Sequence, residues 1–265
     1  MLPEQFNNAM TDKVYGGNIN MKILSIGNSF SEDAHFYLHA LAEQRGIDLQ
    51  TVDIAIGGCS LQMHWNNIVN GSVNYLHNIN GGDDYEKEDI SVEQALKSDA
   101  FDVITLQQVS HYSGQYETYQ PYLNDIISYV RKFQPNARLY LHRTWAYEID
   151  STHGEFSRYD CDQRKMYEAV CKATSQIAKE TDTKLILSAD VIQALRERVP
   201  KFDYKNGGES LCRDGFHLSS IARYAVALTW LATLSNKMVE PMMFMDFDFD
   251  TIKEICKIVN EIVIK

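Results

Sequence analysis

Short apolar runs rich in β-branched residues recur along the chain, and amphipathic segments lie between them. Such a run predicts a buried strand, and apolar residues spaced three and four apart predict a helix. Strands that alternate with helices indicate a mostly parallel sheet covered on both faces. The predicted strands are residues 21–26, 49–56, 101–106, 137–144 and 184–188. The predicted helices are residues 32–45, 91–96, 121–133, 163–179, 191–198, 219–234 and 252–263, with a further candidate at 61–68.

This pattern predicts an α/β fold with a central sheet of about five strands. The length of 265 residues suits one large domain or two small ones. Because the chain contains no internal repeat and no low-complexity linker, we expect a single domain over residues 21–265. Residues 1–20 are polar, and we expect them to form an N-terminal arm.

Composition and charge narrow the class of protein. The net charge is −11 and no Lys/Arg cluster occurs, so we expect no nucleic-acid partner. No apolar run reaches the length of a membrane span, and residues 1–20 lack the apolar core of a signal peptide. The five cysteines form no C-x-x-C pair, which favours reduced thiols in a cytoplasmic protein. The sequence leaves the oligomeric state open.

The first candidate site residue is Ser29, in the segment Gly-Asn-Ser-Phe-Ser that follows the first predicted strand. A strand that ends in a small polar turn before a helix holds a hydroxyl at the carboxyl edge of the sheet, where open α/β folds bind ligands. Ser29 could therefore be a nucleophile. Ser29 and Glu32 also fit a helix capping box, and Ser31 is another candidate cap. The segment alone leaves these roles open.

A second candidate is the pair Asp214 and His217, which lie three residues apart near the other end of the chain. On one turn of chain the two side chains share a side. The carboxylate could therefore bind one imidazole nitrogen and leave the other to face Ser29. Asp-Gly is also a common turn, and His217 could simply lead into the following helix.

Two further polar segments end predicted strands. The glycines at 57 and 58 follow the second strand, where a backbone N–H could approach a reacting carbonyl without hindrance, or simply form a turn. Gln107 and Gln108 follow the third strand. Their amides could donate to an oxyanion or satisfy loop carbonyls.

In chain order, these segments resemble the blocks of the SGNH hydrolases, also called the GDSL-like esterase superfamily. The segment around Ser29 resembles the nucleophile block with Asn28 in place of the usual Asp, Gly58 matches the second-block glycine, and Asp214-x-x-His217 matches the last block. Three segments are similar to the sequences of a bacterial subgroup of uncharacterised members. They are the first block, Leu-Gln-Gln-Val-Ser and Thr-Trp-Ala-Tyr. The resemblance spans residues 22–235 and implies a three-layer, flavodoxin-like sandwich.

The resemblance also implies a mechanism. His217 takes the proton of Ser29, Asp214 orients the imidazole, and the N–H groups of Ser29 and Gly58 bind the oxyanion. The superfamily's third block, Gly-x-Asn-Asp, supplies a further donor, but this chain has two glutamines there. Sialate-acetylesterase-like relatives use Gln at this point, so the resemblance favours Gln107 as the third donor and keeps Gln108 open. It implies no metal and no organic cofactor.

The expected activity is hydrolysis of a small O-acyl ester, acetyl by preference, and the expected partner is a small-molecule or carbohydrate ester. Aromatic side chains between residues 112 and 147 could stack on a sugar, although packing in the core is their more usual role. They are Tyr112, Tyr116, Tyr119, Tyr122, Tyr129, Phe133, Tyr140, Trp145 and Tyr147.

Two alternatives to an esterase remain at this point. One is an SGNH-like domain that binds glycans without turnover, because the third block is altered. The other is a metal-dependent hydrolase that uses His35 and His39, which are spaced i, i+4 but lack the glutamate of the H-E-x-x-H motif.

Overall fold

The computed structural model describes residues 20–82 and 86–264. Within these residues the sheet has seven strands in the order β4-β3-β2-β1-β5-β6-β7. The five strands from β2 to β7 in this order are parallel, as predicted, whereas β3 and β4 are antiparallel to their neighbours. The strands are Asn20–Gly27 (β1), Asp48–Ala55 (β2), Tyr75–Ile79 (β3), Glu86–Ile90 (β4), Val103–Leu106 (β5), Arg138–His142 (β6) and Lys184–Ile186 (β7).

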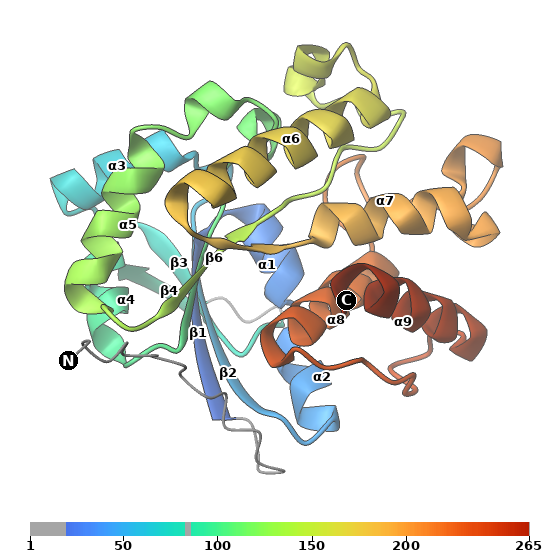
Figure 1. Ribbon diagram of the computed structural model, residues 1–265, viewed down its shortest axis with the longest axis horizontal. Coiled ribbons are helices and arrows are strands. Elements are labelled where there is room, and N and C mark those ends of the chain that lie inside the picture. Colours follow the sequence, from blue (N-terminus) through green and yellow to red (C-terminus); the bar gives the residue numbers. More distant parts are fainter. Residues whose placement is uncertain (1–19, 83–85, 265) are drawn as a thin grey trace, which may run out of the picture.

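Helices cover both faces of the sheet, which confirms the predicted three-layer α/β sandwich (Figure 1). One face carries α1 (Ser29–His35), α2 (Leu38–Gln44), α7 (Ser188–Arg198), α8 (Ser220–Ser235) and α9 (Phe249–Val263). The other carries α3 (Leu61–Asn70), α4 (Val92–Ser98) and α5 (Tyr122–Phe133). The long helix α6 (Gln163–Thr181) contributes buried side chains to both cores.

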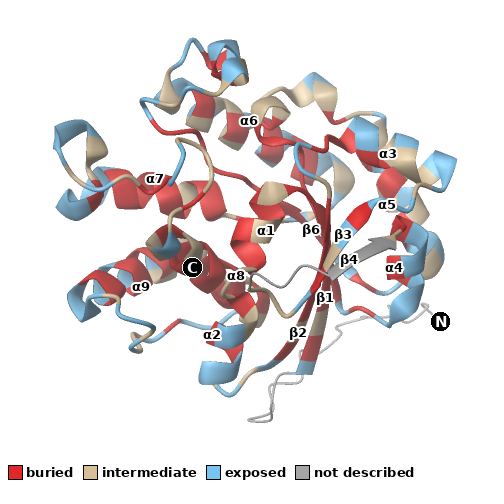
Figure 2. Ribbon diagram, turned by 180° about the vertical axis from the view of Figure 1, so that it is seen from behind, coloured by how far each residue is buried: buried red, intermediate tan, exposed pale blue. Residues whose placement is uncertain are grey.

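Strand β1 shows how the sequence builds the two cores. Met21 and Ile23 pack into the core beneath α8, whereas Leu24 and Ile26 pack into the core beneath α5. Successive side chains of a strand point to opposite faces, so a near-continuous apolar run fills both layers. Buried residues accordingly concentrate on the strands and on α8 (Figure 2).

The structure differs from the prediction at one predicted helix and at two strands that were not predicted. The helix predicted over residues 32–45 is divided into α1 and α2. The N–H of Gly82 donates to the Phe36 carbonyl at 3.0 Å, and a Cβ on Gly81 would collide with the His35 carbonyl oxygen. The chain breaks here because these carbonyls face a neighbouring loop. The antiparallel strands β3 and β4 were not predicted, since their short sequences mix polar and apolar residues.

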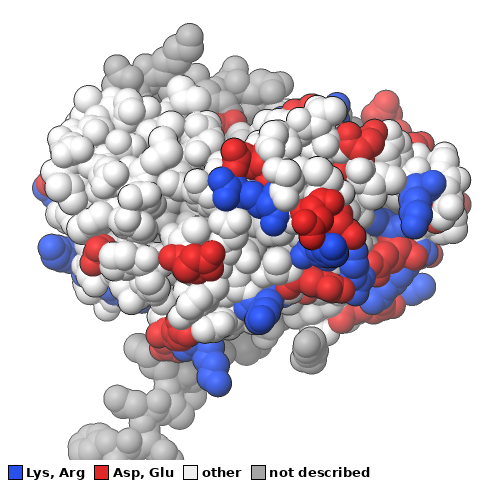
Figure 3. Space-filling view, turned by 90° about the horizontal axis from the view of Figure 1, so that it is seen from above, with Lys and Arg blue, Asp and Glu red and all other residues white. Residues whose placement is uncertain are grey.

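The ends of the chain add little to the fold. Of the predicted arm, residues 1–19 lie outside the described residues, and Asn20 begins β1. None of the helices in the described part of the chain combines the length and the apolar character that a membrane crossing requires. The five cysteines are free thiols. Seen from above Figure 1, acidic and basic side chains alternate on one half of the face and form no continuous basic area there (Figure 3).

Candidate active site

The turn between β1 and α1 presents the Ser29 hydroxyl. Asn28 is the N-cap residue: its backbone is extended, and its side-chain oxygen accepts from the Phe30 N–H at 3.1 Å. Ser29 is therefore the first helical residue rather than the cap, and its hydroxyl is free for another partner. Ser31, the other candidate cap, donates instead to the Asn28 carbonyl at 2.8 Å. A Cβ on Gly27 would collide with Ser31, so this tight turn requires glycine.

The loop that precedes α8 brings the predicted acid and base to this hydroxyl. His217 Nε2 lies 2.8 Å from Ser29 Oγ, and His217 Nδ1 lies 2.7 Å from Asp214 Oδ2. The other carboxylate oxygen of Asp214 accepts the backbone N–H groups of Phe216 and His217 at 3.1 and 2.7 Å. Gly215 has φ +89°, a conformation that allows the loop to turn back on itself. The structure thus joins the three residues predicted as a triad.

The environment fixes the protonation of the pair. Partial burial alone would raise the pKa of Asp214, but the hydrogen bonds from the His217 ring and from two backbone N–H groups outweigh it and lower that pKa. The ionised carboxylate can only accept, so His217 carries its proton on Nδ1. Nε2 is then the acceptor for the Ser29 hydroxyl, which is the orientation that a general base needs.

The turn after β2 carries Gly58. Gly58 is exposed, has φ +68°, and leaves open space where a Cβ would stand. Two bonds tie this turn to the nucleophile turn: Asn28 Nδ2 donates to the Cys59 carbonyl at 3.0 Å, and the Ile56 N–H donates to the Gly27 carbonyl at 3.3 Å. The Ser29 N–H is one of the first-turn donors that have no intrahelical acceptor. The N–H groups of Ser29 and Gly58 therefore lie on two turns that are hydrogen-bonded to each other.

The two glutamines after β5 have different surroundings. The Gln107 amide nitrogen donates to Asn28 Oδ1 at 2.7 Å, so Gln107 supports the N-cap residue directly beneath the nucleophile. Its role as an oxyanion donor stays a prediction. The Gln108 amide nitrogen donates to the carbonyl and hydroxyl of Thr118 at 3.0 and 3.1 Å. The Gln108 oxygen accepts two backbone N–H groups. This commitment to the neighbouring loop argues against Gln108 as a donor.

A buried chain of hydrogen bonds continues below Gln107. The Gln107 side-chain oxygen accepts from His142 Nδ1 at 2.8 Å, and His142 Nε2 accepts from the Ser188 hydroxyl at 2.9 Å. Burial lowers the pKa of His142 to about 3, so the imidazole is neutral near pH 7. Asn28 Oδ1 accepts from the Phe30 N–H, so Gln107 must present its amide nitrogen to Asn28 and its oxygen to His142. This orientation places the proton of the neutral imidazole on Nδ1.

Asp33 anchors the loop that carries Asp214 and His217. It lies one helical turn after Ser29 on α1, and its side chain is 1% exposed. One carboxylate oxygen accepts from Arg213 Nη1 at 2.8 Å and from Arg223 Nε at 2.7 Å, and the other accepts the Leu218 N–H at 2.7 Å. Arg213 and Leu218 flank the Asp214–His217 segment. One face of α1 therefore presents the nucleophile and the anchor of its partner loop.

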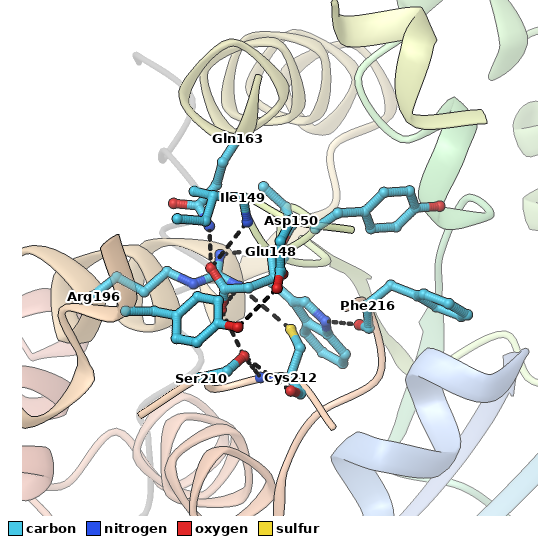
Figure 4. A network of polar contacts seen from close by, with 12 residues as sticks. Glu148, Ile149, Asp150, Gln163, Arg196, Ser210, Cys212 and Phe216 are labelled. Atoms are coloured by element: carbon cyan, nitrogen blue, oxygen red, sulfur yellow. Dashed lines mark hydrogen bonds and ion pairs between the residues drawn. The ribbon is translucent and has the colours of Figure 1, made fainter. Parts of the chain in front are cut away.

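A second polar network holds the other side of this loop (Figure 4). Glu148, which is 2% exposed, accepts from Gln163 Nε2 at 2.7 Å and from the Ser210 hydroxyl at 3.0 Å, and it pairs with buried Arg196 at 3.3 Å. The Glu148 N–H donates to the Gly215 carbonyl at 2.7 Å. The network therefore connects α6 and α7 to the segment between Asp214 and His217.

Sequence reasoning missed these supports, although helical spacing contained a signal for Asp33. A carboxylate four residues after the candidate nucleophile, beside apolar Ala34, is unexpected on a buried helix face. No comparable local signal marks Asn28, Gln107 or Glu148, because their partners lie far along the chain.

Six of the nine aromatic residues considered for sugar binding are buried or pack on a neighbouring ring. Tyr119, Tyr140, Trp145 and Tyr147 are buried. The Tyr129 and Phe133 rings pack together on α5. Core packing, the more usual role expected of these residues, is therefore confirmed for the four buried side chains. The aromatic rings directly beside His217 come from other segments.

The residues of the metal-dependent alternative are used in other ways. His35 is buried and its Nε2 lies 2.6 Å from the Ser25 hydroxyl, whereas His39 Nδ1 lies 2.6 Å from the Leu49 carbonyl. Across the described residues, no group of three or more His, Cys, Asp or Glu side chains is arranged to hold a metal ion.

The strand order and the line from Ser29 to Asp214 define an α/β protein with the fold of the SGNH hydrolases. The chain belongs to the family described as Domain of unknown function (DUF4886), whose pattern matches residues 22–254. A crystal structure of a DUF4886 family protein from Bacteroides uniformis is 33% identical with a TM-score of 0.84, over 91% of this chain and 94% of that one.

More distant structures share the fold. A proposed SGNH hydrolase from Slackia heliotrinireducens is 21% identical with a TM-score of 0.54, over 81% of this chain and 99% of that one. Axe2, an acetylxylan esterase from Geobacillus stearothermophilus, is 12% identical with a TM-score of 0.52, over 81% of this chain and 94% of that one. No curated protein matches the chain.

Proposed function

We propose that this protein is a serine esterase that hydrolyses a small O-acyl ester, acetyl by preference. The observation that carries this proposal is the unbroken line from Ser29 Oγ through His217 to Asp214, with contacts of 2.8 and 2.7 Å. A nucleophile, a base and an orienting carboxylate in this order form the arrangement used for acyl transfer on several unrelated folds. The shared fold with proteins described as hydrolases supports the same class of chemistry.

The first half of the reaction forms an acyl-enzyme. His217 Nε2 accepts the hydroxyl proton as Ser29 Oγ attacks the ester carbonyl, and Asp214 stabilises the resulting imidazolium. The N–H groups of Ser29 and Gly58 bind the negative charge that develops on the carbonyl oxygen. His217 then donates its proton to the departing alcohol.

The second half regenerates the enzyme. A water molecule takes the place of the alcohol and donates its proton to His217 as it attacks the acyl carbonyl. Collapse of the second tetrahedral intermediate returns the proton to Ser29 and releases the carboxylic acid. These steps use only side chains and backbone groups of the site.

The acyl group is proposed to be small, and a carbohydrate is one candidate carrier. Axe2, which shares the fold, is described as an acetylxylan esterase and as an acetyl-xylooligosaccharide esterase. The non-catalytic alternative, a domain that binds glycans without turnover, would leave the aligned hydroxyl and imidazole without a role.

Hydrolysis of p-nitrophenyl acetate tests the proposal. We expect the wild-type protein to release p-nitrophenol and Ser29→Ala to lose this activity while it keeps the wild-type circular dichroism spectrum and melting temperature. Ser98→Ala is a matched control, because Ser98 ends α4 and its hydroxyl donates to the Ala95 carbonyl within that helix. Equal rates for the wild type and Ser29→Ala would overturn the esterase proposal.

A further inference from the structure

A row of four partly exposed rings adjoins the catalytic imidazole. His111 and Tyr112 lie in the 3-10 helix η1 (Ser110–Tyr112) after β5, His153 caps the 3-10 helix η3 (Gly154–Tyr159), and Phe216 lies between Asp214 and His217. The ring centroids are 4.3 Å apart for His217 and Phe216, and 4.9 Å for Phe216 and His153. They are 6.0 Å apart for His153 and His111, and 4.3 Å for His111 and Tyr112. We call these four residues the ring wall.

The ring wall stands on a buried layer. Tyr147 is fully buried, its ring packs on those of His153 and Phe216 at 4.7 and 5.7 Å, and its hydroxyl pairs with the Ser110 hydroxyl at 2.8 Å. Trp145 Nε1 donates to the Phe216 carbonyl at 2.8 Å. A surface supported in this way is already formed before a ligand arrives, which lowers the entropic cost of binding.

The imidazoles of the ring wall present polar hydrogens without charge. His153 Nδ1 accepts the Glu155 N–H at 3.2 Å, so the ring proton of neutral His153 is on Nε2. In the described part of the chain neither His153 Nε2 nor either ring nitrogen of His111 bonds to another residue. Burial, ahead of the neighbouring charges, lowers the pKa of both histidines, which keeps them neutral near pH 7.

The charges beside the outer rings are paired, and the Asp214 carboxylate is bonded to the His217 ring and to two backbone N–H groups. Glu155 forms an ion pair with Arg158, and the Arg158 guanidinium packs over the Tyr112 ring at 5.0 Å. The ring wall therefore combines aromatic faces, neutral N–H donors and balanced charge. A ligand that matches all three properties is an uncharged ring with both C–H faces and hydroxyl groups.

The chemistry of the triad says which part of an ester meets this surface. His217 must donate a proton to the departing alcohol, so the alcohol oxygen lies near Nε2 when the acyl-enzyme forms. The carbonyl oxygen instead faces the Ser29 and Gly58 N–H groups. Side chains packed against the His217 ring are therefore on the alcohol side of the reacting carbonyl.

We propose that the ring wall is the subsite for the alcohol portion of the ester and that this alcohol is an uncharged pyranose. A C–H face of the sugar packs on Phe216, and sugar hydroxyls bond to His153 and His111. This inference rests on the proposed esterase function, and it assigns the specificity to residues outside the triad.

Two acetate esters separate the subsite from the catalytic centre. A methyl glucopyranoside monoacetate carries the sugar, whereas ethyl acetate has the same acyl group and a small alcohol. For His111→Ala and His153→Ala we expect kcat/KM for the sugar acetate to fall about tenfold, mainly through KM, and kcat/KM for ethyl acetate to change less than twofold. His153→Asn keeps an acceptor for the Glu155 N–H and an N–H donor, and it should restore most of the loss. Phe133→Leu, on α5, is the control.

The outcomes distinguish the two proposals. Wild-type hydrolysis of ethyl acetate, together with equal losses for both esters or no loss for either in the histidine variants, would overturn the subsite alone. A wild-type protein that hydrolyses neither ester would overturn the esterase proposal and the subsite with it. Selective loss with the sugar acetate, reversed by His153→Asn, would support both.

Discussion

Ser29 is the first residue of the helix that follows a central strand, whereas Asp214 and His217 lie on the loop that precedes α8. The turn at Ser29 is held by the sheet and by the buried chain of Asn28, Gln107 and His142. The loop is closed by backbone bonds, in which the Arg213 N–H donates to the His217 carbonyl and the Ser219 N–H to the Leu211 carbonyl. Side chains, above all the carboxylate of Asp33, fasten it to the rest of the protein. The fold itself therefore positions the nucleophile, whereas a few long-range bonds fasten the loop that carries its base.

The largest expected effect comes from removing the base. His217→Ala should lower kcat by about 10³-fold or more, because Ser29 would lose its proton acceptor while the nucleophile turn stays intact. His39→Ala is the matched control, since His39 bonds to the Leu49 carbonyl outside the site. Steady-state kinetics with p-nitrophenyl acetate would measure both. A kcat of His217→Ala within tenfold of the wild-type value would show that His217 is not the general base.

The next effect tests the loop anchor. Asp33→Asn should lower kcat by about 10- to 100-fold, because two arginines and a backbone N–H lose their common charged acceptor and His217 shifts from Ser29. Asp190→Asn is the matched control. Asp190 forms an ion pair with buried Arg143, with 2.9 Å between Oδ2 and Nη1, and this pair is not part of the triad. Both variants should lose stability, but only Asp33→Asn should lose turnover. If Asp33→Asn and Asp190→Asn lost the same activity at the same folded fraction, Asp33 would have only a structural role.

The pH dependence of the free energy of unfolding should differ between the buried histidines near the nucleophile and the carboxylate of the loop. Burial lowers the pKa of His35 and of His142 to about 3, and both lie on the nucleophile side. Below pH 6.5 the unfolded chain binds protons that the folded chain does not, so stability falls as the pH falls. Between pH 6.5 and 5.5 each of these histidines should lower the free energy of unfolding by about 1 kcal/mol, because the unfolded imidazole is only half protonated at pH 6.5. Buried His64, whose pKa is lowered to about 4, should add a similar change. Urea unfolding at pH 6.5 and 5.5 would measure it.

The loop carboxylate behaves differently over the same range. The pKa of Asp214 lies below its ordinary value, so Asp214 stays ionised between pH 6.5 and 5.5 and contributes no change in stability there. Its contribution would be lost only as the pH falls through that lowered pKa. An unchanged free energy of unfolding between pH 6.5 and 5.5 would contradict the assignment of His35 and His142 as buried neutral groups.

The smallest effect concerns Gln107. If Gln107 acts through Asn28, Gln107→Ala should lower kcat only about fivefold, because Asn28 keeps its bonds to Phe30 and Cys59. A direct oxyanion donor would cost about 10²–10³ when removed. A loss of that size would return Gln107 to the role that the family resemblance implies, and the kcat of this one variant decides between the two roles.

The sequence predicted the elements that follow from local pattern. The five parallel strands are apolar runs between amphipathic helices, and the segments around Ser29 and Asp214–His217 are short motifs that resemble those of a known superfamily. The sequence predicted Ser29 or Ser31 as the helix cap and missed Asn28, because all three side chains can accept from a first-turn N–H. It also missed the division of α1 from α2, since the cause is a carbonyl bonded to Gly82 far along the chain.

Long-range partners limited the prediction of the site. Gln107 and Gln108 are adjacent and chemically identical, yet one bonds to Asn28 and the other to Thr118. Their difference arises because successive residues point to opposite sides of an extended chain, into different neighbourhoods. Asp33 likewise depends on Arg213 and Arg223, which only the folded chain brings near.

Covalent labelling with a fluorophosphonate, followed by peptide mass spectrometry, tests the central claim most directly. We expect one adduct, on Ser29, whose formation parallels the loss of p-nitrophenyl acetate hydrolysis and is abolished in Ser29→Ala. An adduct on a different residue, or hydrolysis that persists when Ser29 is fully modified, would contradict it.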